Sequence, residues 1–315
     1  SLTTERFEDY WGKKGYLKNI ICRIISEPSV LMIELETGGI DFAAIAPSSD
    51  VQKALNNPDG EITAYLSPEF RNTTLWINCA EGPTADIRVR QALNYAIDKE
   101  ALIKGGFEGI GHVLNQYIPR DAPGYDKELD ENPPYEYSPQ KAKELLAEAG
   151  YPDGLTLEAV SYPTMQTCFE HLKNMLKESN IDINIHIYES AVYSPIIRST
   201  EGWDIYIAQQ GMDCEAGPVL NLQTHVNMAV PGNKEISHYH EMEAAKEYSA
   251  LLDKAKVTLD LQERLKIYSE AEKIFVENVL AIPLRSYGDI YLYNSKINGF
   301  YKNGNKAVWS WCYFE

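Results

Sequence analysis

Apolar residues recur along the chain at helical spacing in some segments and as alternating or continuous short runs in others. Val89, Leu93, Ala96 and Ile97 share one face of a predicted helix, and Asp86 is placed to cap its first turn. The alternating segment INIHIYE and the apolar runs TTLWINC, WDIYIA and VLAIPL predict strands. Because strands and helices alternate through most of the chain, the pattern predicts an α/β protein.

Caps, prolines and glycines set the bounds of the predicted helices. Ser138 is the expected cap and Pro139 the first residue of a helix that Gly150 ends. The predicted helices cover residues 28–37, 51–57, 86–98, 99–105, 138–149, 164–179, 192–199, 240–256 and 261–278. The predicted strands lie within residues 17–25, 42–47, 62–80, 155–160, 183–189, 203–208, 279–284, 289–294 and 307–314.

The length of the chain, 315 residues, favours two globular units. Two extended pieces, TTLWINC and LAIPL, flank its middle, and the tail after the second is expected to return to the first unit. We therefore predict a discontinuous first lobe of residues 1–78 and 284–315 and a second lobe of residues 79–283. The stretch from Gly109 to Tyr137 is too long for a connector, so it is expected to wrap a surface.

Charge and cysteine usage exclude several classes of protein. The chain carries 29 basic and 46 acidic residues, a net charge of −17, so neither nucleic acid nor an anionic membrane surface is an expected partner. No apolar run approaches the roughly 20 residues that span a bilayer. The 5 cysteines are scattered and never form a CxxC pair, which argues against a disulfide framework and a structural zinc site.

The sequence contains no catalytic constellation. It has no GxSxG, no P-loop and no GxGxxG placed between a strand and a helix. The cluster from His238 to Glu241 lacks the HExxH spacing and a third distant ligand, so its position favours an exposed helix start over a metal site. We therefore predict no catalytic residue, no metal site and no cofactor.

Three segments resemble signatures of one family. TTLWINCAEGPTADIRVRQALNYAIDKEALI and YSPQKAKELLAEAGYPDGLTLEAV are similar to two long motifs of the extracytoplasmic solute-binding proteins that serve peptide and nickel ABC transporters. The segment GWDIYIAQQGMD resembles a third, shorter one. This family is bacterial solute-binding protein family 5, which includes oligopeptide- and dipeptide-binding members. The resemblance runs from about Tyr10 to the aromatic tail.

The resemblance implies a two-lobed periplasmic-binding-protein-like fold of type II, in the peptide-binding cluster. Members of the family begin with a stretch that this chain lacks, so the first lobe is expected to be incomplete and the chain to be a C-terminal fragment. The implied function is the solute-binding component of an ABC importer, which closes on a peptide-like or other small solute between its lobes and delivers it to a membrane permease.

The implied location is extracytoplasmic, either periplasmic or as a cell-surface lipoprotein. The expected partners are the small-molecule or peptide ligand and the permease subunits. Contact with the membrane is expected only through a lipid anchor or the permease, and no enzymatic activity is implied.

The first predicted ligand-binding segment follows WDIYIA. In oligopeptide- and dipeptide-binding members, the Asp after Gly-Trp-x-x accepts the α-ammonium of the ligand, and Asp213 occupies that position. Here Gln209 and Gln210 replace Gly-Trp, which removes an aromatic ring from this place, and Glu215 supplies a second acid nearby. The alternative is a solvated loop carboxylate. The candidates in this segment are Gln209, Gln210, Gly211, Met212, Asp213 and Glu215.

The second predicted ligand-binding segment is SYPTMQT, between a strand and a helix, where Tyr162 and Thr164 offer hydroxyl groups. In dipeptide-binding members the equivalent loop supplies an Arg for the peptide carboxylate, but this loop has no Arg, Lys or His. The absent cation argues against a free dipeptide carboxylate. A simple helix start is the alternative interpretation.

Two other classes of function stay open at the level of the sequence. A sensory or regulatory solute-binding module uses the same fold, and a hydrolase is a third interpretation. Adjacent permease and ATPase genes would favour transport, whereas an adjacent kinase or DNA-binding domain would favour sensing. The ligand stays open between a peptide, a nickel chelate, a sugar and another small solute.

Overall fold

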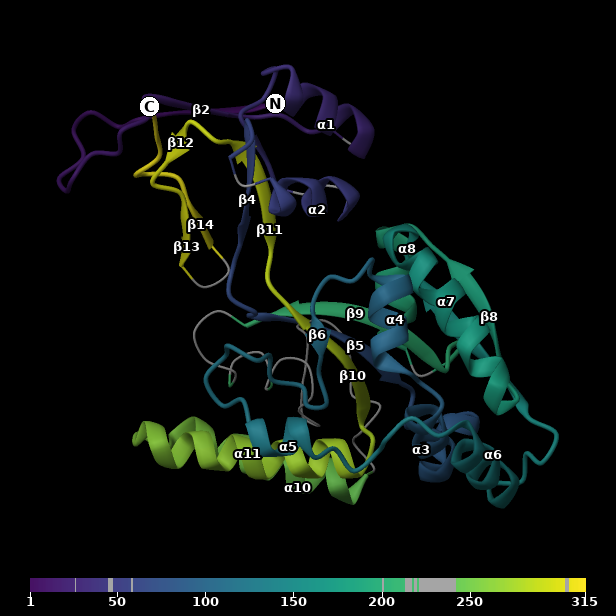
Figure 1. Cartoon of the computed structure of the whole chain (residues 1–315). Coiled ribbons are helices and arrows are strands. Elements are labelled where there is room, and N and C mark those ends of the chain that lie inside the picture. The colour runs from purple at the N-terminus through teal and green to yellow at the C-terminus, as the bar shows by residue number, and fades with distance from the viewer. Residues whose placement is uncertain are drawn as a thin grey trace. The chain divides into compact units, whose positions relative to one another are not determined.

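The chain divides into two compact units in a computed structural model (Figure 1). Unit 1 consists of Ser1–Pro68 and Gly288–Glu315, and unit 2 of Glu69–Tyr287. The structure describes residues 1–25, 27–44, 48–57, 59–199, 201–212, 217, 220, 242–303 and 306–315.

The boundaries of the units differ from the predicted ones, which followed Asn78 and preceded Leu284. Strands β5 (Arg71–Ile77) and β10 (Ala281–Tyr287) pair with each other and lie in the interior of the sheet of unit 2. Their hydrogen bonds and their buried side chains therefore place both strands in unit 2. The prediction had assigned β5 and the end of β10 to the first lobe.

Unit 2 is built on a six-stranded mixed sheet in the order β6-β10-β5-β9-β7-β8. The pairs β6–β10, β10–β5 and β5–β9 are antiparallel, whereas β7 runs parallel to both β8 and β9. The remaining strands are β6 (His112–Val113), β7 (Leu155–Ser161), β8 (Ile181–Ile187) and β9 (Ile205–Gly211).

Helices cover both faces of this sheet, because successive side chains of a strand point to opposite faces. Leu75 and Ile77 pack into one core with residues of α3, α4, α6 and α7, whereas Trp76 packs into a second core with residues of α10 and α11. These helices are α3 (Ile87–Tyr95), α4 (Lys99–Gly106), α6 (Pro139–Glu148), α7 (Gln166–Leu176), α10 (Glu243–Val257) and α11 (Leu261–Glu277).

The predicted helix starts at Asp86, Asp98 and Ser138 are confirmed. Each side chain accepts a hydrogen bond from a backbone N–H group in the first turn of its helix, which satisfies a donor that has no partner within the helix. The shorter helical elements of unit 2 are η1 (Pro83–Ala85), α5 (Lys127–Glu131), η2 (Pro163–Met165), η3 (Lys177–Ser179) and α8 (Ser190–Ile196).

Unit 1 contains a three-stranded antiparallel sheet in the order β3-β11-β4, packed against α1 and α2. The predicted strand over residues 307–314 is wrong as a single element, because a turn interrupts it, in which the N–H of Cys312 donates to Trp309 O at 3.1 Å. The elements of unit 1 are β1 (Leu2–Glu5), β2 (Asn19–Cys22), α1 (Pro28–Glu36), β3 (Phe42–Ala43), α2 (Ser48–Asn56), β4 (Ile62–Leu66), β11 (Ile290–Asn294), β12 (Ile297–Asn298), β13 (Tyr301–Asn303), β14 (Lys306–Val308) and β15 (Tyr313–Phe314).

Candidate functional site

The predicted ligand-binding residues Gln209, Gln210 and Gly211 form the last part of strand β9. In the antiparallel register, Gln209 lies opposite Thr73 and Gly211 opposite Arg71 at the start of β5. Both glutamines are half-buried. Because adjacent side chains of a strand alternate, Gln209 and Gln210 lie on opposite faces of the sheet, so a ligand that contacts both must lie across the end of the strand.

Met212 follows β9 directly, and its side chain is buried in the second core. Its N–H donates to the carbonyl oxygen of Phe70 at 2.7 Å, which continues the pairing with the β5 side of the sheet. Asp213 and Glu215, the two predicted acidic ligand contacts, lie outside the described residues, as does the cluster from His238 to Glu241.

The second predicted segment lies at the same end of the sheet, just after β7. Tyr162 is half-buried, its ring packs edge-on against Tyr193 with centroids 5.3 Å apart, and it shares a side-chain hydrogen bond with Thr164. Burial raises the pKa of Tyr162, and Tyr287 and Arg71 are close enough to affect that pKa as well. The fold therefore brings Tyr162 together with residues of β5 and β10.

Arg285 is a buried cation on β10 that the sequence did not single out. Its guanidinium lies between two rings, 3.8 Å from the centroid of Phe107 and 4.2 Å from that of Tyr287. It donates to Thr73 Oγ1 at 3.0 Å and to the carbonyl oxygen of Ile110 at 2.6 Å. Burial lowers the pKa of Arg285 to about 10, which leaves it charged at neutral pH.

Arg71 begins β5 beside this buried cation. Its Nε donates to the Tyr287 hydroxyl at 3.2 Å, and its guanidinium lies 5.6 Å from the centroid of the same ring. Arginine binds carboxylates through a planar fork of donors. This end of the sheet therefore carries positive charge, although the loop from Ser161 to Thr167 has no cation. For Arg285, the sequence signal that could have been used is its position as a lone Arg within the apolar run VLAIPLRSY.

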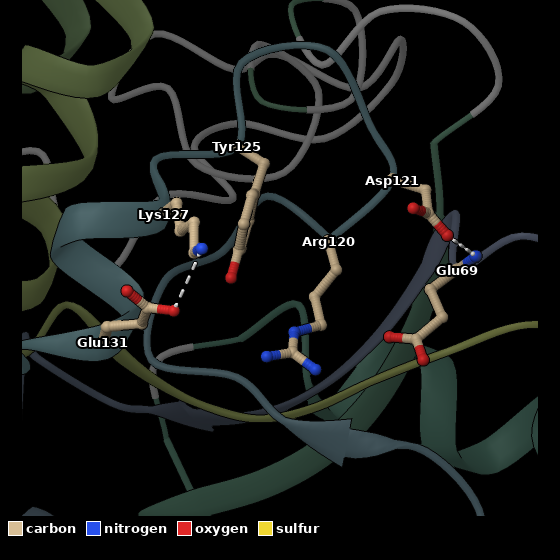
Figure 2. Close-up of a pocket in the computed structure, with 6 residues that line it drawn as sticks. All are labelled: Glu69, Arg120, Asp121, Tyr125, Lys127 and Glu131. Atoms are coloured by element: carbon tan, nitrogen blue, oxygen red, sulfur yellow. Dashed lines mark hydrogen bonds and ion pairs between the residues drawn. The ribbon is translucent and has the colours of Figure 1, made fainter.

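A pocket of about 300 Å³ lies in unit 2 near the starts of β5 and α5 (Figure 2). The N–H of Glu69 donates to Asp121 Oδ2 at 2.6 Å, and the N–H of Asp121 donates to Glu69 O at 3.2 Å. The N–H of Arg120 donates to Ser286 Oγ at 3.1 Å. These contacts join the pocket to β5 and β10. It is lined by Glu69, Arg120, Asp121, Tyr125, Lys127 and Glu131.

The buried carboxylate of Asp130 on α5 holds the segment that forms one wall of this pocket. Asp130 accepts from the N–H of Asn115 at 2.6 Å and from the hydroxyl of Tyr125 at 2.5 Å. Arg120 Nε lies 3.7 Å from the same carboxylate. Lys99 Nζ extends this network by donating to Asn115 Oδ1 at 2.8 Å, and burial lowers the pKa of Lys99 to about 7.

A second buried acid, Glu272 on α11, holds the same segment from the other side. Its carboxylate accepts from the backbone N–H groups of Tyr117, at 2.5 Å, and Ile118. Burial nevertheless raises the pKa of Glu272 to about 8. The stretch from Gly109 to Tyr137, which the sequence predicts to wrap a surface, contains β6 and α5, and these two acids fix its course.

Within the part of the chain that the structure describes, no group of three or more His, Cys, Asp or Glu side chains is arranged to hold a metal ion. The same residues include no helix with the length and apolar character needed to cross a bilayer.

Polar and aromatic side chains gathered at one end of an α/β unit are typical of a protein that binds a small solute. The chain belongs to the bacterial extracellular solute-binding proteins of family 5: the model described as "Bacterial extracellular solute-binding proteins, family 5 Middle" matches residues 1–227. The resemblance predicted from the sequence motifs is thereby confirmed.

Curated relatives in this family differ in the ligands their names give. Heme-binding protein A of Haemophilus influenzae is 27% identical over 286 residues, which cover 88% of this chain and 50% of that protein. The dipeptide-binding protein of Escherichia coli is 24% identical over 283 residues, 88% of this chain and 51% of that protein. This chain therefore spans about half the length of these curated relatives.

Solved structures confirm the predicted α/β class and its two-lobed periplasmic-binding-protein architecture. The periplasmic binding protein DppA from Helicobacter pylori, in complex with the peptide STSA, superposes with a TM-score of 0.83 and 25% identity over 99% of this chain and 60% of that chain. NikA from Brucella suis shares the fold with a TM-score of 0.85 at 19% identity, over 99% of this chain and 65% of that chain.

Proposed function

We propose that this chain is part of the solute-binding component of an ABC importer, which binds a peptide-like or other small solute and delivers it to a membrane permease. Membership of family 5 carries this proposal, because relatives in the family are substrate-binding and not catalytic. The protein acts outside the cytoplasm, in the periplasm or as a lipoprotein at the cell surface, and it performs no covalent chemistry on the solute.

The solute contacts the end of the sheet of unit 2, where β9 and β7 end and β5 begins. Gln209, Gln210 and Tyr162 supply polar groups there, and Arg71 adds a cation. Asp213, which follows this strand in the sequence, accepts an ammonium group of the solute through a charge-assisted hydrogen bond. The remaining proposed contacts are Gly211, Met212, Glu215 and Thr164.

Native mass spectrometry of the full-length protein, purified without added ligand, tests the proposal directly. The expected result is a mass excess from one bound solute, released on denaturation and identified by its fragmentation. Hydrolysis of that solute by the purified protein would instead support the hydrolase interpretation and contradict the proposal.

The substitution Asp213→Asn in the full-length protein tests the ammonium contact. It keeps the size of the side chain and removes its charge, so the affinity for an amine-bearing solute should fall about ten- to a hundredfold, or about 1.5–3 kcal/mol. Glu215→Gln is the matched control, and we expect it to have a smaller effect. Calorimetry that gives an equal affinity for Asp213→Asn and the natural protein would contradict the assignment.

A further inference from the structure

The pocket of about 300 Å³ in unit 2 has a lining with charges of both signs (Figure 2). Lys127 and Glu131 on α5 pair with each other at 3.5 Å, and both are mostly exposed, so they form its rim. Arg120, Glu69 and Asp121 come from the other wall. A site for a bare anion would not carry three acids, and a site for a metal ion would not place a guanidinium among them.

Arg120 is held in a defined position with donors to spare. Its backbone N–H is fixed by Ser286, and the Tyr125 hydroxyl hydrogen-bonds to its side chain. Among the residues that the structure describes, Asp130 is the one carboxylate paired with Arg120, at 3.7 Å. The guanidinium points toward the open middle of the pocket, between Tyr125 and Glu69 (Figure 2). Because a guanidinium has five N–H donors, a bidentate contact with a carboxylate is available.

Glu69 has an acceptor without a partner on the opposite side of the guanidinium. Its side chain is 17% exposed, and its Oε1 contacts Nδ1 of His112. Its Oε2 is buried and accepts no hydrogen bond in the described part of the chain. A buried carboxylate oxygen without a donor is unfavourable, and an ammonium group satisfies it through a charge-assisted hydrogen bond that is stronger than one from a neutral donor. Asp121, which binds the Glu69 N–H through one oxygen, adds negative charge nearby.

We infer that this pocket binds a small zwitterion of the size of a free α-amino acid, with its carboxylate on Arg120 and its ammonium group on Glu69 and Asp121. The volume of the pocket lies at the small end of the range for small-molecule sites. Binding requires the Glu69 carboxylate to turn toward the ammonium group. All lining residues belong to unit 2, and none is among the contacts proposed for the imported solute.

An amide-resolved NMR titration of the whole chain with glycine, acetate and methylammonium tests the inference. Glycine should give saturable shifts confined to the residues around Glu69 and from Arg120 to Glu131. Acetate and methylammonium should each bind at least about tenfold more weakly, because each satisfies only one half of the pocket. Equal affinities for glycine and acetate, or glycine shifts absent or spread over the surface, would overturn the inference.

Two variants assign the halves of the ligand. Arg120→Gln should lower the affinity for glycine and for acetate about tenfold, whereas Glu69→Gln should weaken glycine and leave acetate unchanged or tighter. Lys143→Gln, on the exposed surface of α6, removes one positive charge elsewhere and should leave both affinities unchanged. If Arg120→Gln does not fold, the inference is tested by Glu69→Gln and by the affinities of the natural chain for glycine, acetate and methylammonium. Full glycine affinity in a folded Arg120→Gln variant would refute the carboxylate contact.

These outcomes are separate from those of the proposed function. The import proposal depends on the solute found with the full-length protein and on Asp213, whereas this inference depends on glycine binding at Arg120. Either one therefore stands if the other fails.

Discussion

Single buried ionisable side chains determine much of the local structure of unit 2. Arg285 joins β5, β10 and the segment after α4 through two hydrogen bonds and two rings. Glu272 and Asp130 hold the segment from Asn115 to Tyr125 through backbone and hydroxyl donors. Removing one partner from a buried polar contact leaves the other unsatisfied, so these residues are where substitutions should cost most.

Arg285→Lys should destabilise unit 2 by about 3 kcal/mol although it keeps the charge. The ammonium group has neither the planar stacking surface for Phe107 and Tyr287 nor the fork that reaches Thr73 and Ile110 together. Urea unfolding followed by circular dichroism measures the loss. Lys143→Arg on exposed α6 is the control, and a loss at Arg285 no larger than at Lys143 would contradict the role given to the guanidinium.

Glu272 should make the stability of the chain depend on pH. Its pKa rises from the ordinary 4.5 to about 8 in the folded chain, so the folded chain binds more protons than the unfolded one between these values. Stability therefore falls as the pH rises through this interval. Lys99, whose pKa falls to about 7, has the opposite effect only above pH 7, where stability should rise with pH.

The window from pH 5 to pH 7 isolates the effect of Glu272. Across it the natural chain should lose about 2 kcal/mol more stability than Glu272→Gln, which keeps the shape of the side chain but does not titrate. Urea unfolding at both pH values measures the difference. The same change with pH in both proteins would show that Glu272 is charged in the folded chain.

The candidate site was only partly predictable at the level of residues. Gln209, Gln210 and Tyr162 could be proposed as ligand contacts because each follows or ends a recognisable strand, and that role stays a prediction. Arg285 was missed because a residue distant in the sequence, Phe107, stabilises its charge within an apolar strand, and the local pattern does not show that contact. The pocket around Arg120 was missed for the same reason, since hydrogen bonds from β5, β10 and α5 assemble it.

At the scale of elements, the segment between β6 and α5 has a fixed conformation because the buried acids Asp130 and Glu272 accept hydrogen bonds from it. Asp130 accepts from Asn115 through one carboxylate oxygen and from Tyr125 through the other, and Asp130→Asn replaces one of these oxygens with an NH2 group that only donates. We expect amide hydrogen exchange of residues 115–126 to become at least about tenfold faster, with little change in β5 and β9. Exchange that is unchanged in this segment would show that Glu272 alone holds it.

The elements themselves were largely predictable from local chemistry. Asp86, Asp98 and Ser138 set helix starts through contacts within one turn, so the sequence contains the whole signal. The tail was predicted wrongly because two short strands separated by a turn have the same apolar pattern as one longer strand. Its division depends on pairing with strands elsewhere in unit 1.

At the scale of the whole molecule, unit 2 is a continuous segment whose first and last strands are hydrogen-bonded neighbours. Tyr287 pairs with Arg71, so the two ends of the unit lie side by side. The excised segment Glu69–Tyr287 should therefore unfold cooperatively on its own. Thermal unfolding followed by circular dichroism tests this, and a broad transition without a pretransition baseline would contradict it.

Strand order also explains why the unit boundaries were displaced in the prediction. The apolar runs in the sequence predict the positions of β5 and β10, but they do not indicate which sheet each strand joins. The pairing of β5 with β9, seven residues against seven, is a contact between segments more than a hundred residues apart. Such long-range pairing is decided by the complete fold and not by the local pattern.

The position of β11 in the middle of the small sheet has a consequence for synthesis on the ribosome. Strands β3 and β4 are made early, but neither pairs with the other, because β11 (Ile290–Asn294) separates them. A ribosome must translate the whole of unit 2 before that strand exists. Unit 2 can acquire its structure while translation continues, whereas β3 and β4 must wait with unpaired strand edges until β11 has been translated.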